Sequence, residues 1–381
     1  MSLLKNENNE SLVLYERPGR GPITKTTFQR RSQKLQELSN GEVKVRVDYV
    51  SIDPTMRTWL NPGRSYIPPV QVGAVMRAAG IGRVVTSKAD GFSEGDLVFG
   101  ELGWQEYWQG SSKSVKRREI PQGGRDIDHL GLLGVSGLTA YFGLFDIGRL
   151  RDGDTVLISA AAGSVGLIAT QIALAHLRCK VIAIAGSVEK CDLLKKLGCH
   201  EVLNHKERNF KNKLKQVGLI DVYFDNVGGE ILDQVLTQLA DHARIILCGS
   251  LTTYNSQSPY GLTNTPNLIS SKASMTGFIT FDYASRYPEA RAYLSSLRNI
   301  GKLRYDYTVL YPVEGQNGLS RCVEALEQMF RGENLGKTWV GRFSPFLTNT
   351  EIQAEIQTRQ NFSGRGSPTQ LEEQIIIPGS E

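Results

Sequence analysis

The sequence predicts an α/β protein with two parts, a β-rich domain and a doubly wound parallel sheet. Three observations lead to this fold class. Short β-like stretches separated by Gly and Pro occupy residues 12–110, strand-like and helix-like segments alternate from about residue 130, and the strands of the second region are continuously apolar, as in VLIS at residues 156–159. Such alternation is typical of parallel sheets, and continuously apolar strands suit a sheet covered by helices on both faces.

The β-rich domain is predicted to begin the chain and to occupy residues 1–130. Its clearest strand is EVKVRVDYVSI at residues 42–52, in which apolar and polar residues alternate with period two. Further strands are predicted at residues 80–85 and 96–100, and GFSEGD at residues 91–96 is the turn that leads into the second of these.

The doubly wound sheet is predicted within residues 131–300, with strands at 155–159, 180–185, 221–225 and 244–248 and helices at 164–176, 188–197 and 230–239. The chain should then return to the first domain over residues 301–344, through a β-like segment at 305–311, a helix at 318–329 and a strand at 337–343. Residues 345–381 are polar and poor in aromatic residues, which predicts a disordered tail.

The composition excludes several classes of protein. No apolar run reaches the roughly 18 residues of a membrane span, and the polar first ten residues do not resemble a secretory signal, so a cytoplasmic enzyme without a membrane partner is expected. The five cysteines never form a CxxC pair, which argues against a disulfide framework. The net charge is +5, and the basic run KSVKRR at residues 113–118 has no interleaved aromatic residues, so we interpret it as a solvated loop and expect no nucleic-acid partner.

A glycine-containing turn follows the first strand of the predicted parallel sheet. In the segment AAAGSVG at residues 160–166, Ala161, Gly163 and Gly166 have GxGxxG spacing, with Ala in place of the first Gly. Such a turn points backbone N–H groups at a pyrophosphate, and the helix that begins at Ser164 and Val165 adds the positive end of its dipole. The pattern indicates a dinucleotide site, although an ordinary tight turn would have the same residues.

The end of the second strand indicates which dinucleotide binds. An NAD site normally has Asp or Glu about 20 residues after the turn, where a carboxylate accepts a hydrogen bond from the ribose 2′-OH. This chain instead has Gly186, Ser187 and, one helical turn later, Lys190. A site with space, a hydroxyl and a cation favours a 2′-phosphate, so the expected cofactor is NADPH. The alternative for Lys190 is an ordinary lysine on a helix surface.

These segments together resemble the prostaglandin reductase, leukotriene dehydrogenase and plant double-bond reductase branch of the medium-chain dehydrogenase/reductases. The resemblance covers about residues 43–340. It is carried by the AAGSVG turn, by AGS with Lys190, and by YVSIDPTMR (49–57), GLTAYFGL (137–144), YFDNVGG (223–229), CGS (248–250), TYN (253–255) and NLGKT (334–338).

The resemblance implies a GroES-like β-barrel catalytic domain around an inserted Rossmann domain, with NADPH in the cleft between them. It implies cofactor contacts from Thr139, Gly163, Val165, Gly186, Lys190 and Asn334, and residues near the ribose, nicotinamide or substrate at Asn226, Cys248 and Tyr254. The chain departs from the family pattern at Thr55, at Val135-Ser136-Gly137, and at Asn204-His205-Lys206, where relatives have a Tyr that holds the 2′-phosphate ribose. His205 can stack or donate there. Such proteins are usually dimers, so a homodimer is expected.

Zinc-dependent alcohol dehydrogenases of the same superfamily bind metal through Cys and His-Glu ligands. Here the segment SIDP at residues 51–54 occupies the position of their first Cys ligand, and no GHE context surrounds any of the five histidines, His129, His176, His200, His205 and His242. We therefore expect no metal. Without a Lewis acid, oxidation of a simple alcohol is disfavoured.

The expected reaction is reduction of the carbon–carbon double bond of a small enal or enone by hydride transfer to the β-carbon, which needs only positioned reactants and hydrogen-bond donors. Candidate proton donors are Tyr254 and Tyr49, although Tyr49 is equally well explained as a strand aromatic in the barrel core. Arg57 is expected to pair with Asp53 at the cleft rim and, like Tyr49, is a candidate substrate contact. Candidate substrate contacts, which core packing would explain equally well, are Tyr66, Tyr260 and Phe281.

Three other functions fit the same residues. The enzyme alternatives are a quinone reductase and a pathway-specific enoyl reductase of secondary metabolism. A third possibility is an NADPH-binding protein without turnover. Rates with quinones, enals and enones would separate these functions.

Overall fold

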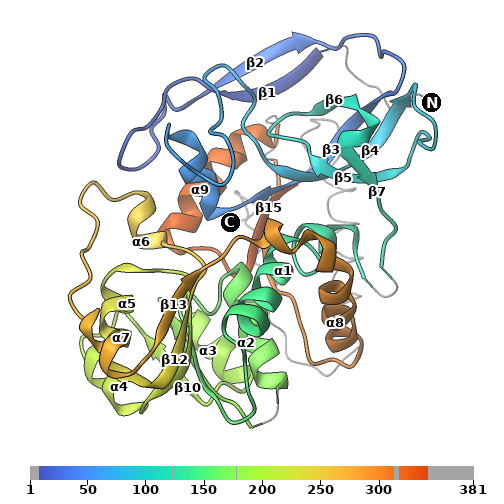
Figure 1. The fold of residues 1–381 in the computed structure, drawn as a ribbon. Helices are drawn as coiled ribbons and strands as arrows, with labels where there is room; N and C mark the ends of the chain where they lie inside the picture. The colour runs from blue at the N-terminus through green and yellow to red at the C-terminus, as the bar shows by residue number, and fades with distance from the viewer. Residues whose placement is uncertain (1–7, 122–123, 177, 313–316, 342–381) are drawn as a thin grey trace, which may run out of the picture.

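A computed structural model describes residues 8–121, 124–176, 178–312 and 317–341 of the chain. The described residues form two parts, one built on a mostly antiparallel sheet and one on a parallel sheet, with α9 (Leu319–Arg331) and β15 (Lys337–Gly341) at their junction (Figure 1). This mixed α/β arrangement confirms the predicted fold class. The predicted tail at residues 345–381 lies outside the described residues.

The first sheet, as far as it is described, has the strand order β14-β15-β3-β4-β5-β7, and β6 pairs with β3. Its early strands are β3 (Glu42–Ile52), β4 (Ala79–Ser87), β5 (Leu97–Glu101), β6 (Tyr107–Ser111) and β7 (Val115–Arg117). A separate two-stranded sheet joins β1 (Asn8–Leu14) and β2 (Phe28–Lys34). The strands predicted at 42–52, 80–85 and 96–100 correspond to β3, β4 and β5, whereas β1, β2, β6 and β7 had no sequence prediction.

The end of the described chain completes this sheet. Strand β15 lies between β14 (Tyr307–Leu310) and β3, parallel to the former and antiparallel to the latter. Helix α9 places Leu319, Cys322, Ala325 and Leu326 in the same hydrophobic core as the valines of β3. The core of this sheet is thus assembled from segments far apart in the chain, such as Val50 and its partner Val340, which are 290 residues apart.

Strand β3 does not keep one alternation along its length. Its pairing with β4 shifts register between Val47 and Tyr49. As a result Val45 and Val47 share a core with Val50 and Ile52, although the two pairs differ in parity, and Tyr49 packs into a different cluster. A bulge that inserts one residue exchanges the faces of all residues beyond it, so a simple period-two pattern misassigns the second half of this strand.

The second sheet, within the described residues, is wholly parallel, with the order β10-β9-β8-β11-β12-β13. This is the doubly wound order in which the chain reverses direction beside the first strand. The strands are β8 (Thr155–Ile158), β9 (Lys180–Ala185), β10 (Glu201–Asn204), β11 (Ile220–Asp225), β12 (Leu239–Leu247) and β13 (Ser274–Gly277). The short outer strands β10 and β13 had no sequence prediction.

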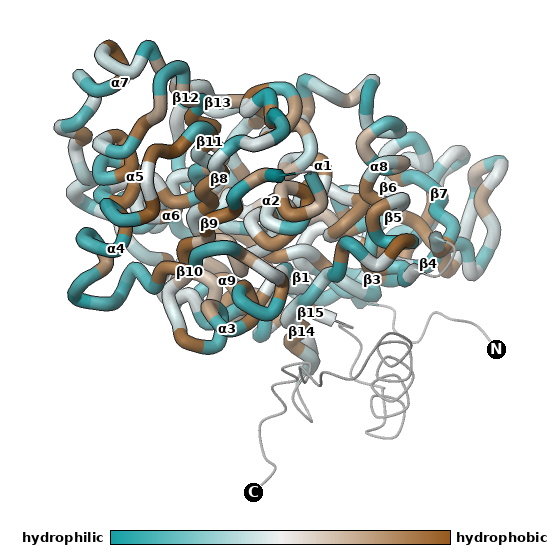
Figure 2. Tube along the Cα trace, turned by 90° about the horizontal axis from the view of Figure 1, so that it is seen from below, coloured by the Kyte–Doolittle hydropathy of each residue, from teal (hydrophilic) through white to brown (hydrophobic). Residues whose placement is uncertain are grey.

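Helices cover both faces of the parallel sheet, whose apolar strands lie inside the molecule (Figures 1 and 2). Val156 and Ile158 of β8 face one core, and Leu157 between them faces the other. The first core is closed by α1 (Val135–Phe142), α2 (Ser164–Ala175), α3 (Val188–Lys196) and α8 (Tyr287–Asn299), and the second by α4 (Phe210–Gln216) and α5 (Gly229–Val235). The short helices α6 (Leu251–Tyr254) and α7 (Pro266–Ser270) follow β12.

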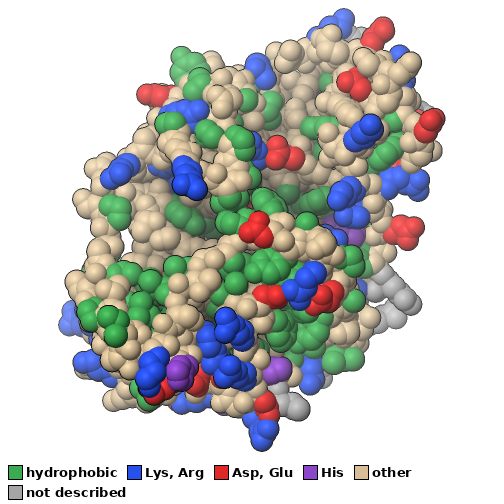
Figure 3. Space-filling view, viewed as in Figure 1, with side chains coloured by type: hydrophobic (Ala, Val, Ile, Leu, Met, Phe, Trp, Pro, Cys, Tyr) green, Lys and Arg blue, Asp and Glu red, His purple; other side chains and the backbone are tan. Residues whose placement is uncertain are grey.

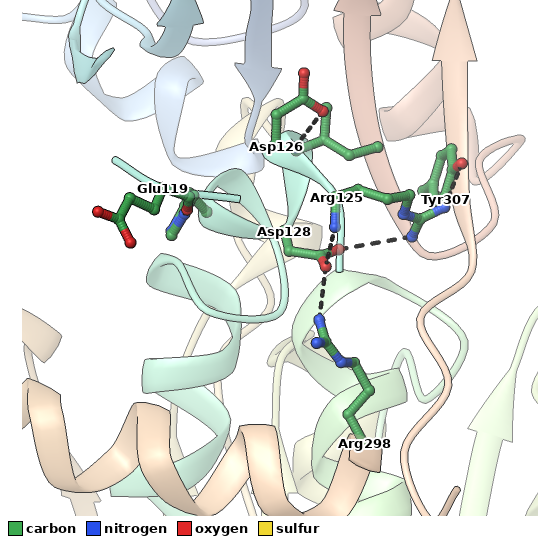
Figure 4. Close-up of polar contacts among 8 residues, drawn as sticks. Glu119, Arg125, Asp126, Asp128, Arg298 and Tyr307 are labelled. Atoms are coloured by element: carbon green, nitrogen blue, oxygen red, sulfur yellow. Dashed lines mark hydrogen bonds and ion pairs between the residues drawn. The ribbon is translucent and has the colours of Figure 1, made fainter. Parts of the chain in front are cut away.

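A buried carboxylate joins the segments through which the chain enters and leaves the parallel-sheet part (Figure 4). Asp128, 3% exposed, accepts a 2.8 Å hydrogen bond from Arg298 of α8 and a 2.9 Å bond from the backbone N–H of Arg125. The Arg125 guanidinium stacks 4.4 Å from the ring of Tyr307 in β14. Paired charges that are also hydrogen-bonded fix the two crossing segments against each other.

No helix in the described ranges combines the length and the apolar character that crossing a bilayer requires.

Candidate active site

A cavity of about 520 Å³ lies between the two parts of the molecule, where the surface is visibly hollowed (Figure 3). Residues that follow β8, β9 and β11, such as Ala160, Gly186 and Asn226, line one side. Residues that follow β3 and α9, such as Asp53 and Asn334, line the other. The carboxyl ends of β8 and β11 flank the point where the strand order reverses, which is where doubly wound sheets bind ligands.

The turn between β8 and α2 is tightly packed. Ala160 has a positive φ of 46°, and its carbonyl accepts the N–H of Gly163 at 2.9 Å. A Cβ on Gly166 would lie 2.2 Å from that same carbonyl oxygen, so only Gly lets α2 approach the turn this closely. Ser164 and Val165 begin α2 and line the cavity, with no side-chain cap on the helix N-terminus. The turn therefore fits a pyrophosphate.

The end of β9 presents a cation to the cavity. Ser187 caps α3 by accepting the backbone N–H of Lys190 at 3.3 Å, so its hydroxyl serves the helix and Ser187 is not among the lining residues. The Lys190 ammonium reaches across the cleft and donates to the carbonyl of Gly332 at 2.7 Å. Burial lowers the pKa of Lys190 to about 8, so the amine remains mostly protonated at neutral pH.

The charges of the lining are unevenly distributed. Lys190, Lys206 and Arg331 line the cavity beside His205, whereas Asp53 is the only carboxylate among the described lining residues. Asp53 already pairs with the buried Lys337. An excess of cations at the tip of β9 fits a dinucleotide that has an additional phosphate on its adenosine ribose.

The centre of the cavity has polar groups held by the strand ends. Asn226 donates through Nδ2 to the carbonyl of Ser159 at 2.7 Å, and Thr139 of α1 shares a 2.7 Å hydrogen bond with Thr280. Tyr254 of α6 accepts the backbone N–H of Ser250 at 3.2 Å. Burial raises the pKa of Tyr254, which therefore keeps its proton at neutral pH.

Cys248 and Asn334 also line the cavity. Burial raises the pKa of Cys248 to about 12, so its thiol is neutral and serves as a small apolar wall rather than a nucleophile. Asn334 donates to the carbonyl of Gly336 at 3.0 Å. Gly336 in turn donates its N–H at 2.9 Å to the carbonyl of Ala162, in the turn between β8 and α2 that we call the phosphate turn. The segment after α9 is thus attached directly to the turn.

The outer end of the cavity is aromatic. The rings of Tyr66 and Phe281 lie 6.1 Å apart, and both residues are about half exposed. The Tyr66 hydroxyl lies 2.6 Å from that of Thr55. Phe278 and Ile279 add apolar surface, and this end has room for a conjugated organic molecule.

Five predicted residues lie away from the lining: Ser187, described above, and Tyr49, Tyr260, Ala161 and Arg57. Tyr49 is 1% exposed and packs among Ile81, Trp339 and their neighbours, because the register shift in β3 turns it to that side. Tyr260 donates its hydroxyl proton to the carboxylate of Asp233 in α5 at 3.2 Å. Ala161 lies beneath the phosphate turn, where it donates its N–H to Ile184 at 3.0 Å.

Arg57 is the fifth, and the expected pairing of Arg57 with Asp53 is wrong. The Arg57 guanidinium is fully buried and donates to the carbonyls of Gly19 and Gly21 and, at 3.0 Å, to Oδ1 of Asn255. Asp53 instead accepts from Lys337 and from Ser51. Arg57 follows Asp53 by four residues, but the intervening 3₁₀ helix (Pro54–Leu60) directs the two side chains to different partners.

Sequence reasoning missed Lys337, Thr338, Lys206 and Arg331. Thr338 has a buried hydroxyl in the lining without a hydrogen-bond partner among the described residues. These residues come from segments far apart in the chain, so no local sequence pattern predicts that they lie together. The NLGKT segment at residues 334–338, which contains Lys337 and Thr338, was the one sequence pattern that pointed to any of them.

No group of three or more His, Cys, Asp or Glu side chains arranged for a metal occurs among the residues that the structure describes.

A parallel sheet in this order, a glycine-containing turn and a cavity that faces a second sheet define a dinucleotide-dependent oxidoreductase. Family models agree: residues 10–117 match the N-terminal domain of oxidoreductase, and residues 164–296 match zinc-binding dehydrogenase. The chain belongs to the medium-chain dehydrogenase/reductase family of NADP-dependent oxidoreductases.

Several relatives are similar along most of their length. The NADPH-dependent curcumin reductase of Escherichia coli is 34% identical over 343 residues, which cover 87% of this chain and 96% of that protein. The NADP(+)-dependent 2-alkenal reductase of Nicotiana tabacum is 36% identical, with coverages of 80% and 88%. The crystal structure of CurA from Vibrio vulnificus in complex with NADPH has a TM-score of 0.81 at 34% identity and covers 88% of this chain and 100% of that one. The predicted family is confirmed, and the predicted cofactor agrees with these relatives.

Proposed function

We propose that this protein binds NADPH and reduces the carbon–carbon double bond of α,β-unsaturated aldehydes or ketones. One observation carries the proposal: a single cavity extends from a basic end at the start of α2 and the tip of β9 to an aromatic end, and Tyr254 is among its lining residues. The relatives named for curcumin and 2-alkenal reduction support the same reaction class.

The cofactor would lie along the carboxyl edge of the parallel sheet. Its pyrophosphate is proposed to bind at the start of α2, and its 2′-phosphate at the tip of β9. The proposed contacts are those predicted residues that line the cavity, namely Thr139, Gly163, Ser164, Val165, Gly166, Gly186, Lys190, His205, Asn226, Cys248, Tyr254 and Asn334.

A bound nicotinamide would supply hydride-transfer chemistry to the β-carbon of the substrate, and this chain's residues would then have to stabilise the negative charge on the carbonyl oxygen. Tyr254 is the proposed donor to that oxygen or to the α-carbon. Its hydroxyl oxygen accepts the N–H of Ser250, which leaves the O–H proton available for donation. Because burial raises the pKa of Tyr254, the proton is present throughout the neutral range.

The substrate is proposed to lie against Tyr66 and Phe281, next to Thr55. These side chains come from the two different parts of the molecule, and their rings, 6.1 Å apart, would form an aromatic wall beside a planar conjugated system. Aromatic walls exclude water from the enolate-like charge, which strengthens the hydrogen bond from Tyr254.

Steady-state rates with NADPH and NADH across a panel of enals, enones and quinones test the proposal. We expect turnover of enals or enones with NADPH, with kcat reduced by about 10²- to 10⁴-fold in Tyr254→Phe. Tyr260→Phe is the matched control, because Tyr260 lies outside the cavity lining and should leave kcat unchanged.

Three results would contradict it. Faster turnover of quinones than of every enal or enone would favour the quinone reductase alternative. Activity with one complex enoyl substrate alone would favour a pathway-specific reductase. Tight NADPH binding without turnover of any substrate would indicate a binding protein.

We also propose a homodimer. Strand β13 ends the described strand order of the parallel sheet, and Ser274, Thr276 and Gly277 on it are exposed. An open edge strand offers unpaired backbone groups to a second copy. Light scattering should give twice the 42.1 kDa mass of the chain, and a charged substitution such as Thr276→Lys should shift the mass toward the monomer.

A further inference from the structure

The side chain of His205 occupies an unusual place at the tip of β9. The backbone N–H of His205 donates to the carbonyl of Ala185 at 3.0 Å, which fixes the residue beside the strand end. Its Nε2 lies only 2.6 Å from the position that a Cβ on residue 186 would take. Since residue 186 is Gly, the imidazole can lie directly against the backbone, with the ring in the cavity lining.

The cations around His205 disfavour protonation of its imidazole. Lys190 faces it from α3, and Lys206 follows it in the chain; burial and both of these cations lower the pKa of His205. Carboxylates on the same segments of the chain interact with other cations: Glu189 interacts electrostatically with Lys190, Glu207 binds Lys213 at 2.6 Å, and Glu333 binds Arg331 at 2.6 Å. In the free protein His205 is therefore neutral at neutral pH.

A 2′-phosphate placed here would reverse this balance. It adds about two negative charges near neutral pH, and an opposite charge within about 4–6 Å favours the protonated imidazole. Lys190, whose pKa is about 8, is already mostly protonated at pH 7, so the mostly neutral imidazole is the neighbouring group that can take up the larger part of a proton there.

We propose that His205 takes up one proton from solvent when a 2′-phosphorylated dinucleotide binds, so that the preference for NADPH over NADH strengthens as the pH falls. The proton passes from a buffer acid to the unprotonated ring nitrogen, and no other bond changes. This inference rests on the NADPH site proposed above.

The sign of the pH dependence follows from linkage. Binding raises the pKa of His205 from below its ordinary value, so the bound state holds more protons and NADPH affinity falls as pH rises between the free and bound pKa values. A single linked proton changes the dissociation constant by at most about tenfold per pH unit. NADH lacks the phosphate and should show almost no such change.

Isothermal titration calorimetry in buffers of different ionisation enthalpy counts the protons taken up. The ligands are NADPH, NADH and 2′,5′-ADP, titrated at pH 7.2 into the whole protein. We expect a fraction of one proton for NADPH and for 2′,5′-ADP, none for NADH, and loss of the uptake in His205→Asn. The matched control is His242→Asn, a histidine outside the cavity lining, which should behave as the wild type.

Lys190→Arg separates the two titrating groups, because Arg keeps its charge at every pH used. Uptake that persists in Lys190→Arg supports His205 as the acceptor. Uptake that disappears in Lys190→Arg, or that survives unchanged in His205→Asn, overturns the inference, as does its absence in the wild type. Because calorimetry measures binding and not turnover, its result does not depend on the identity of the substrate. Binding of NADH without binding of NADPH would instead overturn the cofactor proposal itself.

Discussion

Replacing Gly166 by Ala gives the most direct test of the phosphate turn. The added Cβ would lie 2.2 Å from the carbonyl oxygen of Ala160 and 2.9 Å from the Cα of Ala161. Both are backbone atoms of a turn that also holds β9 through Ala161, so neither can rotate away. Ordinary contact requires α2 to move outward by roughly 1 Å, since carbon and oxygen atoms approach to about 3.2 Å or more.

Overpacking of this kind typically costs about 1–3 kcal/mol of unfolding free energy. For a domain of this size, that cost should lower the melting temperature by on the order of 5 °C. A 1 Å displacement of the cofactor also lowers the catalytic rate by roughly 100-fold. Thermal unfolding by circular dichroism without cofactor measures the first effect, and steady-state kinetics measure the second.

Gly163→Ala is the matched control in the same turn. A Cβ on Gly163 would lie 3.2 Å from Ala160 oxygen, which requires an adjustment of only a few tenths of an ångström. This variant should therefore melt close to the wild type while binding NADPH less well, because the new methyl group occupies the space of the pyrophosphate. The reasoning is refuted if Gly166→Ala melts with the wild type, or if both variants lose the same stability.

Three further substitutions have defined expectations. Lys190→Met should weaken NADPH binding by about 10- to 100-fold, the value of one charge-assisted hydrogen bond, and leave NADH binding unchanged; equal losses for both would contradict the site. Arg57→Lys should lower the unfolding free energy by about 3 kcal/mol, because the donors of an ammonium all lie on one nitrogen and cannot reproduce the planar fork that reaches Gly19, Gly21 and Asn255, as a urea titration would show. Burial raises the pKa of Glu106 from 4.5 to about 7, so the folded state holds an extra proton only between these two pH values, and stability falls as the pH rises through this range. Glu106→Gln should remove up to about 3 kcal/mol of that fall, and an unchanged dependence of stability on pH would exclude this role.

The sequence predicted those parts of the site that depend on neighbouring residues in the chain. The turn at Gly163 and Gly166 and the strand tip at Gly186 and Lys190 are local patterns, and each lies in the cavity lining. Their function follows from backbone geometry and charge within about 30 residues, which periodicity and spacing can encode.

The remaining parts depend on contacts that sequence spacing does not reveal. The position of Tyr49 is determined by a register shift against β4, and a single inserted residue is invisible in a period-two pattern. The partner of Asp53 is Lys337, 284 residues away. Tyr260 follows the Tyr254 loop closely in the chain, yet Asp233 of α5 holds it outside the cavity. The positions of Tyr49, Asp53 and Tyr260 are therefore determined by strand pairing and by contacts with buried charged groups, which are properties of the folded state.

The position of β15 between β14 and β3 has a consequence for synthesis of the chain. Although β15 is an interior strand of the first sheet, it is translated last among the described elements, some 220 residues after β7. Translation of that length takes on the order of 10 s or more, and during this time β3 lacks the strand that pairs with it in the finished sheet. The parallel-sheet part meanwhile has all of its own strands. The nascent protein therefore passes through a stage with one domain folded and the other exposed at β3, when chaperone capture or premature pairing with another chain is most favourable.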